Sequence, residues 1–367
     1  MDKNYILIIG WVAVMAMLSV LTSVKQEETV CGKKEYRWRP VWAVVTFLPL
    51  IIWCGYRGNI GDTWAYKKSF SEMPVSLGGM ASYMATVKKD KGFYFVSAVI
   101  KCIVGNHVNI YFIVLAVIQA GVLIYVYRKY SSRYLMSFFL FLASTDYISW
   151  MFNGIRQFTA VTITFIGIKF ILDKKYVKAI VLILIASLMH QSALLMIPFI
   201  FIVQGKAWNK KSVLCILGCI LILIFVNQFT DGMNNILSNT QYSNMVADWK
   251  EWEDNGTNPI RVFVYSIPMI LSIIGRKQIK EADNPVINIV TNFSILTSVI
   301  AMVSMKTSGI FIGRLISYGS MYSASILLPW EIENIFTRNS TIIIKSATVL
   351  GYIGFFYYQM HFIWGLI

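Results

Sequence analysis

Long apolar runs separated by short polar segments dominate the chain. Most of these runs have the length, about 20 residues, that crosses a hydrocarbon core of about 30 Å as a helix. Lipid offers no hydrogen bonds to a bare backbone, so each run must be helical. The pattern therefore predicts an all-α, polytopic membrane bundle with about ten full spans: Tyr5–Thr22, Pro40–Tyr56, Val108–Tyr127, Tyr134–Trp150, Met151–Leu172, Ser212–Phe229, Pro259–Gly275, Val286–Met305, Ile310–Trp330 and Ser346–Trp364.

Two apolar stretches do not fit a simple span. Gly92–Gly105 is short and contains Lys101, which predicts an interfacial helix. Ala179–Val203 is long enough to span, but it carries the polar pair His190 and Gln191 at its middle. It is either one continuous span or a broken, re-entrant pair of half-helices with His190 at the tip.

The distribution of basic residues favours the broken pair, because cytoplasmic loops of membrane proteins are enriched in Lys and Arg. Only this arrangement places six basic loops on one side: Lys25–Arg39, Arg128–Arg133, Asp173–Lys178, Gln204–Lys211, Arg276–Pro285 and Glu331–Lys345. That side is then the cytoplasm. The outer side receives the amino terminus, Arg57–His107, the His190 tip and the acidic loop Thr230–Asn258. We interpret the first apolar run as a retained span, because no signal-peptide cleavage pattern follows it.

The composition changes this picture little. Only 14% of the 367 residues are charged, whereas a soluble domain carries about 25%. A helical bundle in a membrane is one unit, so we expect a single transmembrane domain over residues 1–367. The net charge of +15 fits loops that face anionic lipid, so we expect membrane lipid and no nucleic acid as a partner. The five cysteines are scattered and predict neither a disulfide framework nor a metal site.

Charged side chains in the spans are the first candidates for a site, because burying a charge in a membrane is costly. In this topology five charged side chains fall in the outer half of the bilayer, and His190 points to the same level. The five are Arg57, Asp146, Arg156, Arg261 and Arg314. Arginine binds phosphate oxygens through a planar fork, so the set predicts a site for an anionic ligand that is reached from outside. The alternative is that arginines at span ends, such as Arg57 and Arg261, only snorkel to headgroups.

One helix face is unusually polar. Asn153, Arg156 and Gln157 are spaced by three and four residues, so they lie on the same face and predict a ligand-binding side. Hydrogen bonds between helices are the alternative interpretation. Asp146 precedes a predicted tight turn at Trp150 and could pair with Arg156 across it, which we interpret as a structural contact.

The outer segment Tyr56–Tyr66 is polar, glycine-rich and aromatic. Flexible loops of this kind suit sugar binding, because aromatic rings stack on pyranose faces. We therefore expect Trp64 and Tyr66 to bind sugar.

Three side chains are candidate general bases: His190, Asp62 and Asp90. Ordinary solvated carboxylates and a structural histidine are the alternatives. The sequence has no P-loop, no G-x-G-x-x-G, no H-E-x-x-H and no D-x-D, so we expect neither a metal nor a cofactor. We interpret the acidic run Asp248–Asp254 as a solvated face rather than a cation site.

Several of these residues form a larger pattern: Arg57, Gly61-Asp62, Tyr66, Asp90 with Gly92-Phe93, the block Phe152-Asn153-Gly154-Ile155-Arg156-Gln157, His190 with Ser192-Ala193, and Pro198. This pattern resembles the EpsG family of Wzy-type polysaccharide polymerases. The block from Phe152 to Gln157 is its most specific part, and Arg314 with Pro329 resembles a weaker C-terminal pattern. The chain departs from the family at Lys91, where a proline or small residue is common.

The resemblance implies a multi-pass enzyme of bacterial exopolysaccharide or capsule assembly, acting on the outer face of the plasma membrane. Such an enzyme joins oligosaccharide repeat units carried on undecaprenyl diphosphate, which serve as donor and acceptor. The resemblance implies a chain-length regulator as a protein partner and, by analogy, a glycosyltransferase C-like architecture.

On this interpretation the lipid diphosphate leaves as the acceptor hydroxyl attacks. Arg156 and Arg314 bind the diphosphate, with Arg57 and Arg261 as helpers. His190 ranks before Asp62 as the general base.

Two other classes of protein stay open. A flippase of lipid-linked sugars needs a charged path to both leaflets, whereas the deep charges lie on the predicted outer side apart from Lys169. A membrane O-acyltransferase would explain His190 but not the arginines. Loss of the protein separates the classes, because repeat units then face outward without a polymerase and stay inside without a flippase. Without an acyltransferase the polymer keeps its normal length.

Overall fold

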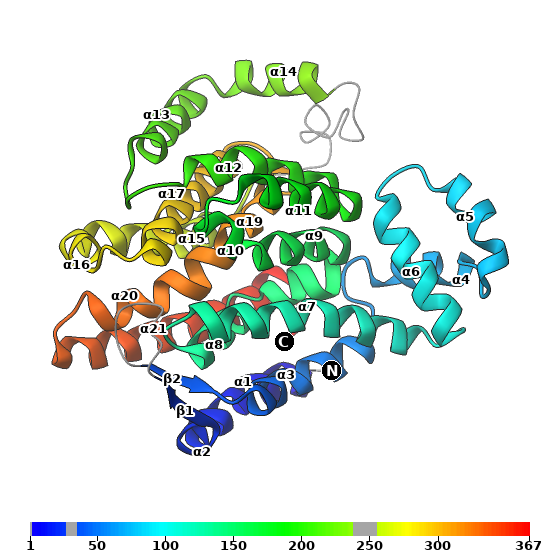
Figure 1. Ribbon diagram of the computed structural model, residues 1–367, viewed down its shortest axis with the longest axis horizontal. Helices are drawn as coiled ribbons and strands as arrows, with labels where there is room; N and C mark the ends of the chain where they lie inside the picture. Colours follow the sequence, from blue (N-terminus) through cyan, green and yellow to red (C-terminus); the bar gives the residue numbers. More distant parts are fainter. Residues whose placement is uncertain (1, 27–34, 238–254) are drawn as a thin grey trace. The chain divides into compact units, whose positions relative to one another are not determined.

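A computed structural model describes residues 2–26, 35–237 and 255–367, and it consists of helices with one short hairpin (Figure 1). This confirms the predicted all-α, polytopic class. The chain divides into two compact units. The first comprises Met1–Phe170, Lys175–Leu194 and Thr337–Ile367, and the second comprises Ile171–Lys174 and Leu195–Phe336. The expectation of a single transmembrane domain stays a prediction.

The first unit contains both ends of the chain. Its elements are α1 (Asp2–Met17), α2 (Ser19–Thr22), β1 (Ser23–Gln26), β2 (Glu35–Trp38), α3 (Pro40–Gly55), α4 (Thr63–Glu72), the 3-10 turn Leu77–Gly79, α5 (Met80–Thr86), α6 (Lys91–Val104), α7 (Val108–Tyr130), α8 (Tyr134–Ala143), the π-helical segment Tyr147–Asn153, α9 (Ile155–Ile166), α10 (Ile168–Leu172), α11 (Tyr176–Met189), the 3-10 turn Gln191–Leu195, α21 (Arg338–Tyr358) and the π-helical segment Gln359–Ile363. The last residues of α10 and of the Gln191–Leu195 turn belong to the second unit.

The second unit is built around α17. Its elements are α12 (Met196–Ile202), α13 (Lys210–Ile224), α14 (Val226–Leu237), α15 (Pro259–Ile274), α16 (Arg276–Ala282), α17 (Pro285–Met305), α18 (Ile312–Leu315), α19 (Ser317–Tyr322), the π-helical segment Ser323–Leu327 and α20 (Leu328–Asn334). The starts of α15 and α17 follow from local sequence: the side chains of Asn258 and Asn284 accept hydrogen bonds from the first turn, and proline occupies the next position.

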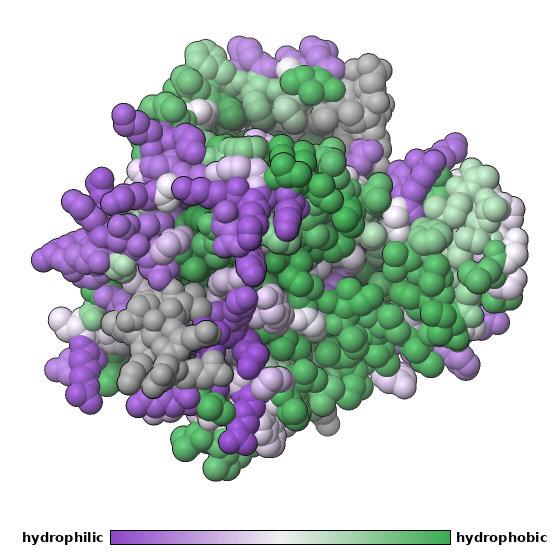
Figure 2. Space-filling view, in the orientation of Figure 1, coloured by the Kyte–Doolittle hydropathy of each residue, from purple (hydrophilic) through white to green (hydrophobic). Residues whose placement is uncertain are grey.

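Three helices in the described part of the chain are long and apolar enough to cross a membrane: Val108–Tyr130, Pro285–Met305 and Arg338–Ile363. The number rises to six if each of three sharply bent helix pairs counts as one span. Helix α7 exposes Ile110, Val117 and Ile118, and Figure 2 shows hydrophobic surface over this helix. An apolar exterior of this kind suits contact with lipid.

The helices are more interrupted than the apolar pattern predicts. The predicted span Tyr134–Trp150 bends by 77° between α8 and the π-helical segment, so the turn lies near Asp146 rather than at Trp150. Thr145 in this bend has a left-handed φ of 61°. The last long helix begins at Arg338, well before the predicted Ser346. Hydrophobic runs indicate burial, but they do not determine where the backbone turns.

Two predicted loops also contain regular structure. The loop Lys25–Arg39 includes strand β2, which pairs with β1 in an antiparallel hairpin. The loop Arg276–Pro285 contains helix α16. The acidic run Asp248–Asp254 lies outside the described residues.

The predicted break at His190 is confirmed. Helix α11 ends at Met189, and His190 is extended, with φ −161° and ψ 123°. A 3-10 turn begins at Gln191. The predicted helix in Gly92–Gly105 is α6. The side of a membrane on which these elements lie stays a prediction.

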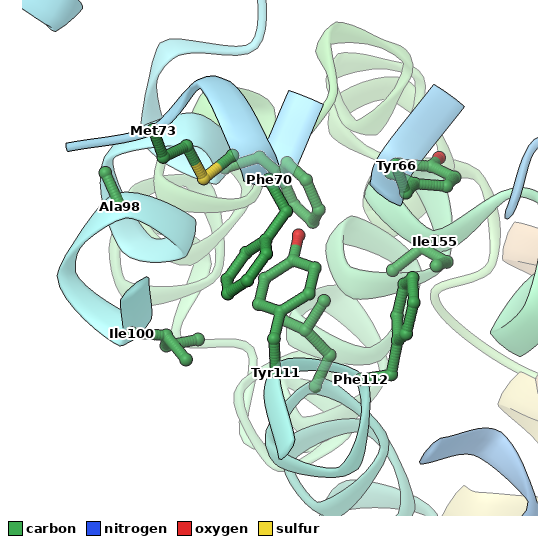
Figure 3. Close-up of a cluster of buried hydrophobic side chains, with 10 residues drawn as sticks. Tyr66, Phe70, Met73, Ala98, Ile100, Tyr111, Phe112 and Ile155 are labelled. Atoms are coloured by element: carbon green, nitrogen blue, oxygen red, sulfur yellow. The ribbon is translucent and has the colours of Figure 1, made fainter. Parts of the chain in front are cut away.

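A buried cluster holds the segment after α3 against the first unit (Figure 3). Helix α4 contributes Phe70, which stacks on Tyr111 of α7 with ring centroids 4.6 Å apart. The remaining members come from α4 with its C-cap, α6, α7 and α9: Tyr66, Met73, Phe93, Ala98, Ile100, Phe112, Leu115 and Ile155. Burial of these rings and aliphatic chains fixes α4 and α6 beside the start of α9. Arg156 lies in that first turn of α9.

Candidate active site

The centre of the candidate site is an ion pair between Arg156 and Asp90. Nη1 of Arg156 lies 2.8 Å from Oδ2 of Asp90. The Asp90 side chain is 2% exposed and that of Arg156 is 26% exposed. The carboxylate is therefore enclosed, while part of the Arg156 side chain is exposed.

The pairing differs from the one that the sequence suggests. We expected Arg156 to meet Asp146 across a tight turn, but the structure pairs it with Asp90, 66 positions earlier. The bend near Asp146 lies before the π-helical segment, which separates the two residues along the chain. Oδ1 of Asp146 instead accepts a hydrogen bond from the indole of Trp150, at 3.3 Å.

Two tyrosines contact the Arg156 guanidinium. Its Cζ lies 5.9 Å from the ring centroid of Tyr94, close enough for a cation–π contact. The guanidinium also interacts with the Tyr66 phenol. Burial raises the pKa of Tyr66, and the positive charge of Arg156 opposes that shift. Tyr66 is 7% exposed, so its ring has no open face for a sugar, and we assign it to positioning Arg156.

Asn153 joins the segment Tyr56–Tyr66 to the start of α9. Its Oδ1 accepts a hydrogen bond from the backbone N–H of Asp62, at 2.9 Å. A Cβ at Gly61 would lie 2.3 Å from the same oxygen, and Gly61 has a φ of +50°. Glycine is therefore required there for space and for backbone conformation. The oxygen of Asn153 thus serves the fold rather than the predicted diphosphate. Asp62 and Trp64 are exposed, and Trp64 keeps a ring available for stacking.

His190 lies at the same end of the first unit as Arg156. Helices α9 and α11 pack together as an antiparallel hairpin, which places the start of α9 beside the end of α11. Helix α6 approaches α11 at Gly92, where a Cβ would lie 2.6 Å from Leu188 Cβ and 2.9 Å from the Leu188 oxygen. The ring Nδ1 of His190 lies 2.7 Å from Ser192 Oγ, which orients the imidazole. Three helices thus bring Asp90, Arg156 and His190 to one end of the unit.

Arg57 is buried between two aromatic rings. Its Cζ lies 3.9 Å from the ring centroid of Phe112 and 5.2 Å from that of Phe152. Its Nη1 donates a 2.7 Å hydrogen bond to the Met151 carbonyl, inside the π-helical segment. The residue is only 5% exposed, so we assign Arg57 to holding this segment rather than to the predicted binding of diphosphate. π-Helical turns are frequent at functional sites, and this one leads directly into Asn153.

A buried glutamine that the sequence analysis did not select supports the first turn of α9. Gln119 of α7 donates hydrogen bonds to the Ile155 carbonyl at 3.2 Å and to Thr159 Oγ1 at 3.0 Å. Gln157, which we predicted to bind ligand, is buried on the same helix. A glutamine inside the apolar run of α7 was the signal available in the sequence, because polar groups in spans need partners.

Arg261 and Arg314 belong to the second unit. Arg261 donates hydrogen bonds from Nε and Nη2 to the hydroxyl of Tyr265, at 3.2 and 3.0 Å. Arg314 is exposed in the short helix α18. The predicted convergence of all four arginines stays a prediction.

Close backbone contacts bring these two arginines to one end of that unit. The Thr257 N–H donates to the Ser304 carbonyl at 3.0 Å, and Ser304 Oγ donates to Thr257 Oγ1 at 2.8 Å. A Cβ at Gly313, the residue before Arg314, would lie 2.5 Å from Thr257 Oγ1. The start of α15 and the start of α18 are therefore adjacent.

The described residues contain no group of three or more His, Cys, Asp or Glu side chains that could hold a metal ion.

A protein-family model matches residues 41–364, and it describes the EpsG family. The chain belongs to the EpsG family. Membership implies a polysaccharide polymerase-like function in exopolysaccharide biosynthesis. No curated protein and no solved structure matches the chain. The matched residues of this EpsG protein include all of the second unit, most of the first, and every side chain of the candidate site.

The lysine variant at position 57 tests the structural role of that arginine. We expect Arg57→Lys to keep polymer output within about threefold of wild type, because an ammonium can still donate to the Met151 carbonyl and lie on Phe112. Arg57→Ala should lower output at least about tenfold, because the carbonyl and both rings lose their partner. Polymer length and protein abundance in membranes are the measurements. If Arg57→Lys were as inactive as Arg57→Ala, the result would indicate that Arg57 binds phosphate, because phosphate binding needs the planar fork of arginine.

Proposed function

We propose that this EpsG protein joins oligosaccharide repeat units that hang from undecaprenyl diphosphate, on the outer face of the bacterial membrane. The observation that carries the proposal is the Arg156–Asp90 pair, in which the arginine is paired at 2.8 Å while its side chain stays partly exposed. Diphosphate oxygens compete with the carboxylate for such a fork, because both offer two acceptors in one plane.

The reaction needs charge stabilisation more than it needs an activating group. The acceptor hydroxyl attacks the anomeric carbon of the donor, a new C–O bond forms, and the bond from that carbon to the diphosphate oxygen breaks. The bonding electrons leave with the lipid diphosphate. Arg156 stabilises the charge that develops on this leaving group, and a preorganised cation in a water-poor site is the most effective means of doing so.

A base must accept the proton of the attacking hydroxyl. His190 is the first choice, because its imidazole is half-buried, oriented by Ser192 and located at the Arg156 end of the unit. Asp62 is the second choice as an exposed carboxylate held at its backbone by Asn153. Asp90 can act as the base only when the diphosphate displaces its carboxylate from Arg156.

Polymerisation of a purified lipid-linked repeat unit by the purified protein tests the proposal. We expect products that lengthen by whole repeat units with release of undecaprenyl diphosphate. Cells lacking the protein should accumulate single units that already face outward. Units retained on the inner face would instead indicate a flippase.

The reaction should not require a divalent cation. The leaving group is already activated, and arginines supply the positive charge that a metal would otherwise provide. Protein treated with a chelator is therefore expected to keep its polymerising rate. Activity that returns only on addition of magnesium or manganese would contradict this and direct attention to Asp62 and Asp90.

His190 should be reachable from outside the cell. The prediction rests on the helix break at this residue and on the charges of the flanking loops. A His190→Cys variant, in a background without the native cysteines, should react with an impermeant thiol reagent that is applied externally. Labelling only from the cytoplasm, with an outward-facing Gln204–Lys211 loop, would reverse the topology.

A further inference from the structure

Three exposed lysines flank the Arg156–Asp90 pair. Lys88, Lys89 and Lys91 surround Asp90 in the turn between α5 and α6. Asp90 itself adopts a left-handed φ of 53° and directs its carboxylate inward to Arg156. This ion pair therefore fixes the turn, and with it the three lysines, next to the candidate site. Figure 2 shows hydrophilic surface over the turn between α5 and α6.

The lysines are not used by the fold. Among the described residues they make no hydrogen bond or ion pair. Of the other cations of the same described segment, Lys68 is likewise exposed without a side-chain partner, and Lys67 donates to Asn59 Oδ1 at 3.3 Å. Lys101 donates to Asn106 Oδ1 at 2.8 Å and lies over the ring of Phe70, and Arg57 is held by Met151. Of the cations in this segment that lack a partner, only the three lysines adjoin Asp90 in the chain and so lie beside its ion pair with Arg156.

The charge of the whole segment is unusual for its predicted side of the membrane. Residues 57–107 contain seven Lys or Arg and three Asp or Glu. Outer segments are normally poor in basic residues, because the positive charges of membrane proteins concentrate in the cytoplasm. The other long outer segment, Thr230–Asn258, follows the rule and is acidic. A cationic outer segment beside the site thus indicates an anionic ligand.

We infer that Lys88, Lys89 and Lys91 bind the carboxylate or phosphate groups of an acidic glycan, so that the repeat unit joined at this site is an acidic oligosaccharide. The inference rests on the proposed function, because it is the site of glycosyl transfer that brings a sugar chain past these lysines. Flexible lysines suit this role better than fixed forks do, since acidic groups recur along a moving chain at varied orientation. Exposed Trp64 supplies a stacking ring on the same segment.

The test measures glycan binding to the full-length protein in nanodiscs of phosphatidylcholine. The probes are oligogalacturonate, which is acidic, and dextran oligomers, which are neutral. We expect wild-type protein to bind oligogalacturonate with an affinity that falls with salt and to bind dextran much more weakly. The variant Lys88→Gln/Lys89→Gln/Lys91→Gln should weaken oligogalacturonate binding about tenfold, since three exposed ion pairs are lost.

A matched variant controls for unspecific attraction. Lys174, Lys175 and Lys178 form a similar exposed group at the turn before α11. Their replacement by glutamine should leave oligogalacturonate binding unchanged. Equal losses in both triple variants, or equal binding of both probes, would overturn the inference. The inference would also be overturned if the Lys88/Lys89/Lys91 variant lost co-purifying anionic lipid but kept its glycan binding. That result would show that the three lysines bind lipid headgroups.

The two proposals fail separately. Binding needs no turnover, so lysine-dependent binding by a protein that cannot extend the lipid-linked unit would reject the polymerase and retain the acidic-glycan surface. A protein that extends the unit but binds oligogalacturonate without help from the three lysines would reject only the surface.

Discussion

Arg156→Lys is expected to reach wild-type abundance in the membrane and to make little or no polymer, with a loss of at least about 100-fold. The charge is kept, and an ammonium can still pair with Asp90. What is lost is the planar fork that binds two diphosphate oxygens in place of the Asp90 carboxylate. The measurements are polymer length and the amount of protein in purified membranes.

Two further variants separate catalysis from structure. If Arg156 only balances the buried Asp90 carboxylate, the double variant Asp90→Asn/Arg156→Gln removes both charges and should stay active. Removing one partner alone would leave an uncompensated charge, so Asp90→Asn by itself cannot decide the question. We expect the double variant to be present in the membrane and inactive. The exposed Arg276→Lys serves as the control and should make normal polymer. Wild-type polymer from the double variant would show that Arg156 is structural.

Gly92→Ala is expected to abolish polymer formation by separating two helices rather than by removing a reactive group. The added Cβ would lie 2.9 Å from the Leu188 carbonyl oxygen and 3.0 Å from its carbonyl carbon, so backbone rather than a flexible side chain must move. Movement of α6 away from α11 shifts Asp90 at one end of the contact and His190 at the other. A displacement of about 1 Å at a reacting group can cost about 100-fold in rate.

The matched control for this variant is Gly121→Ala, in the middle of α7. A Cβ there meets no atom within 4 Å, and alanine favours a helix over glycine. We expect Gly121→Ala to be as abundant and as active as wild type. The comparison is made on polymer output per membrane-bound protein, so that a general loss of folding is corrected for. Normal output from Gly92→Ala would show that the spacing of α6 and α11 does not position the site.

Several features of the site were predictable because they depend on local chemistry. The block from Asn153 to Gln157 is a polar face in an apolar helix, and polar groups in lipid need partners. The helix break at His190 follows from a histidine and a glutamine within an apolar stretch. The starts of α15 and α17 follow from an asparagine before a proline. Each of these signals extends over only a few residues of sequence.

The partners of these residues depend on segments that are distant in the chain. Asp90 and Arg156 are 66 positions apart, and Arg57 reaches a carbonyl 94 positions away. Whether Tyr66 is an open sugar platform or a buried support for Arg156 is decided by α6, α7 and α9, which close over it. Nothing in the local sequence shows that position 92 must be glycine. The requirement arises from the close approach of Leu188, which leaves no space for a Cβ.

The sequence by itself thus determined that the chain is a helical membrane protein, and it indicated most of the residues of the site. The reason is that the length of an apolar run and a charge inside such a run can both be read directly from the sequence. Only the tertiary structure decided which of the selected residues act together. In the structure Arg156 pairs with Asp90 rather than Asp146, and Arg57 is buried against Phe112. Three exposed lysines lie next to Asp90 in the chain. The physical reason is that apolar periodicity fixes which face of a helix is covered, whereas ion pairs and close approaches depend on which helix covers it.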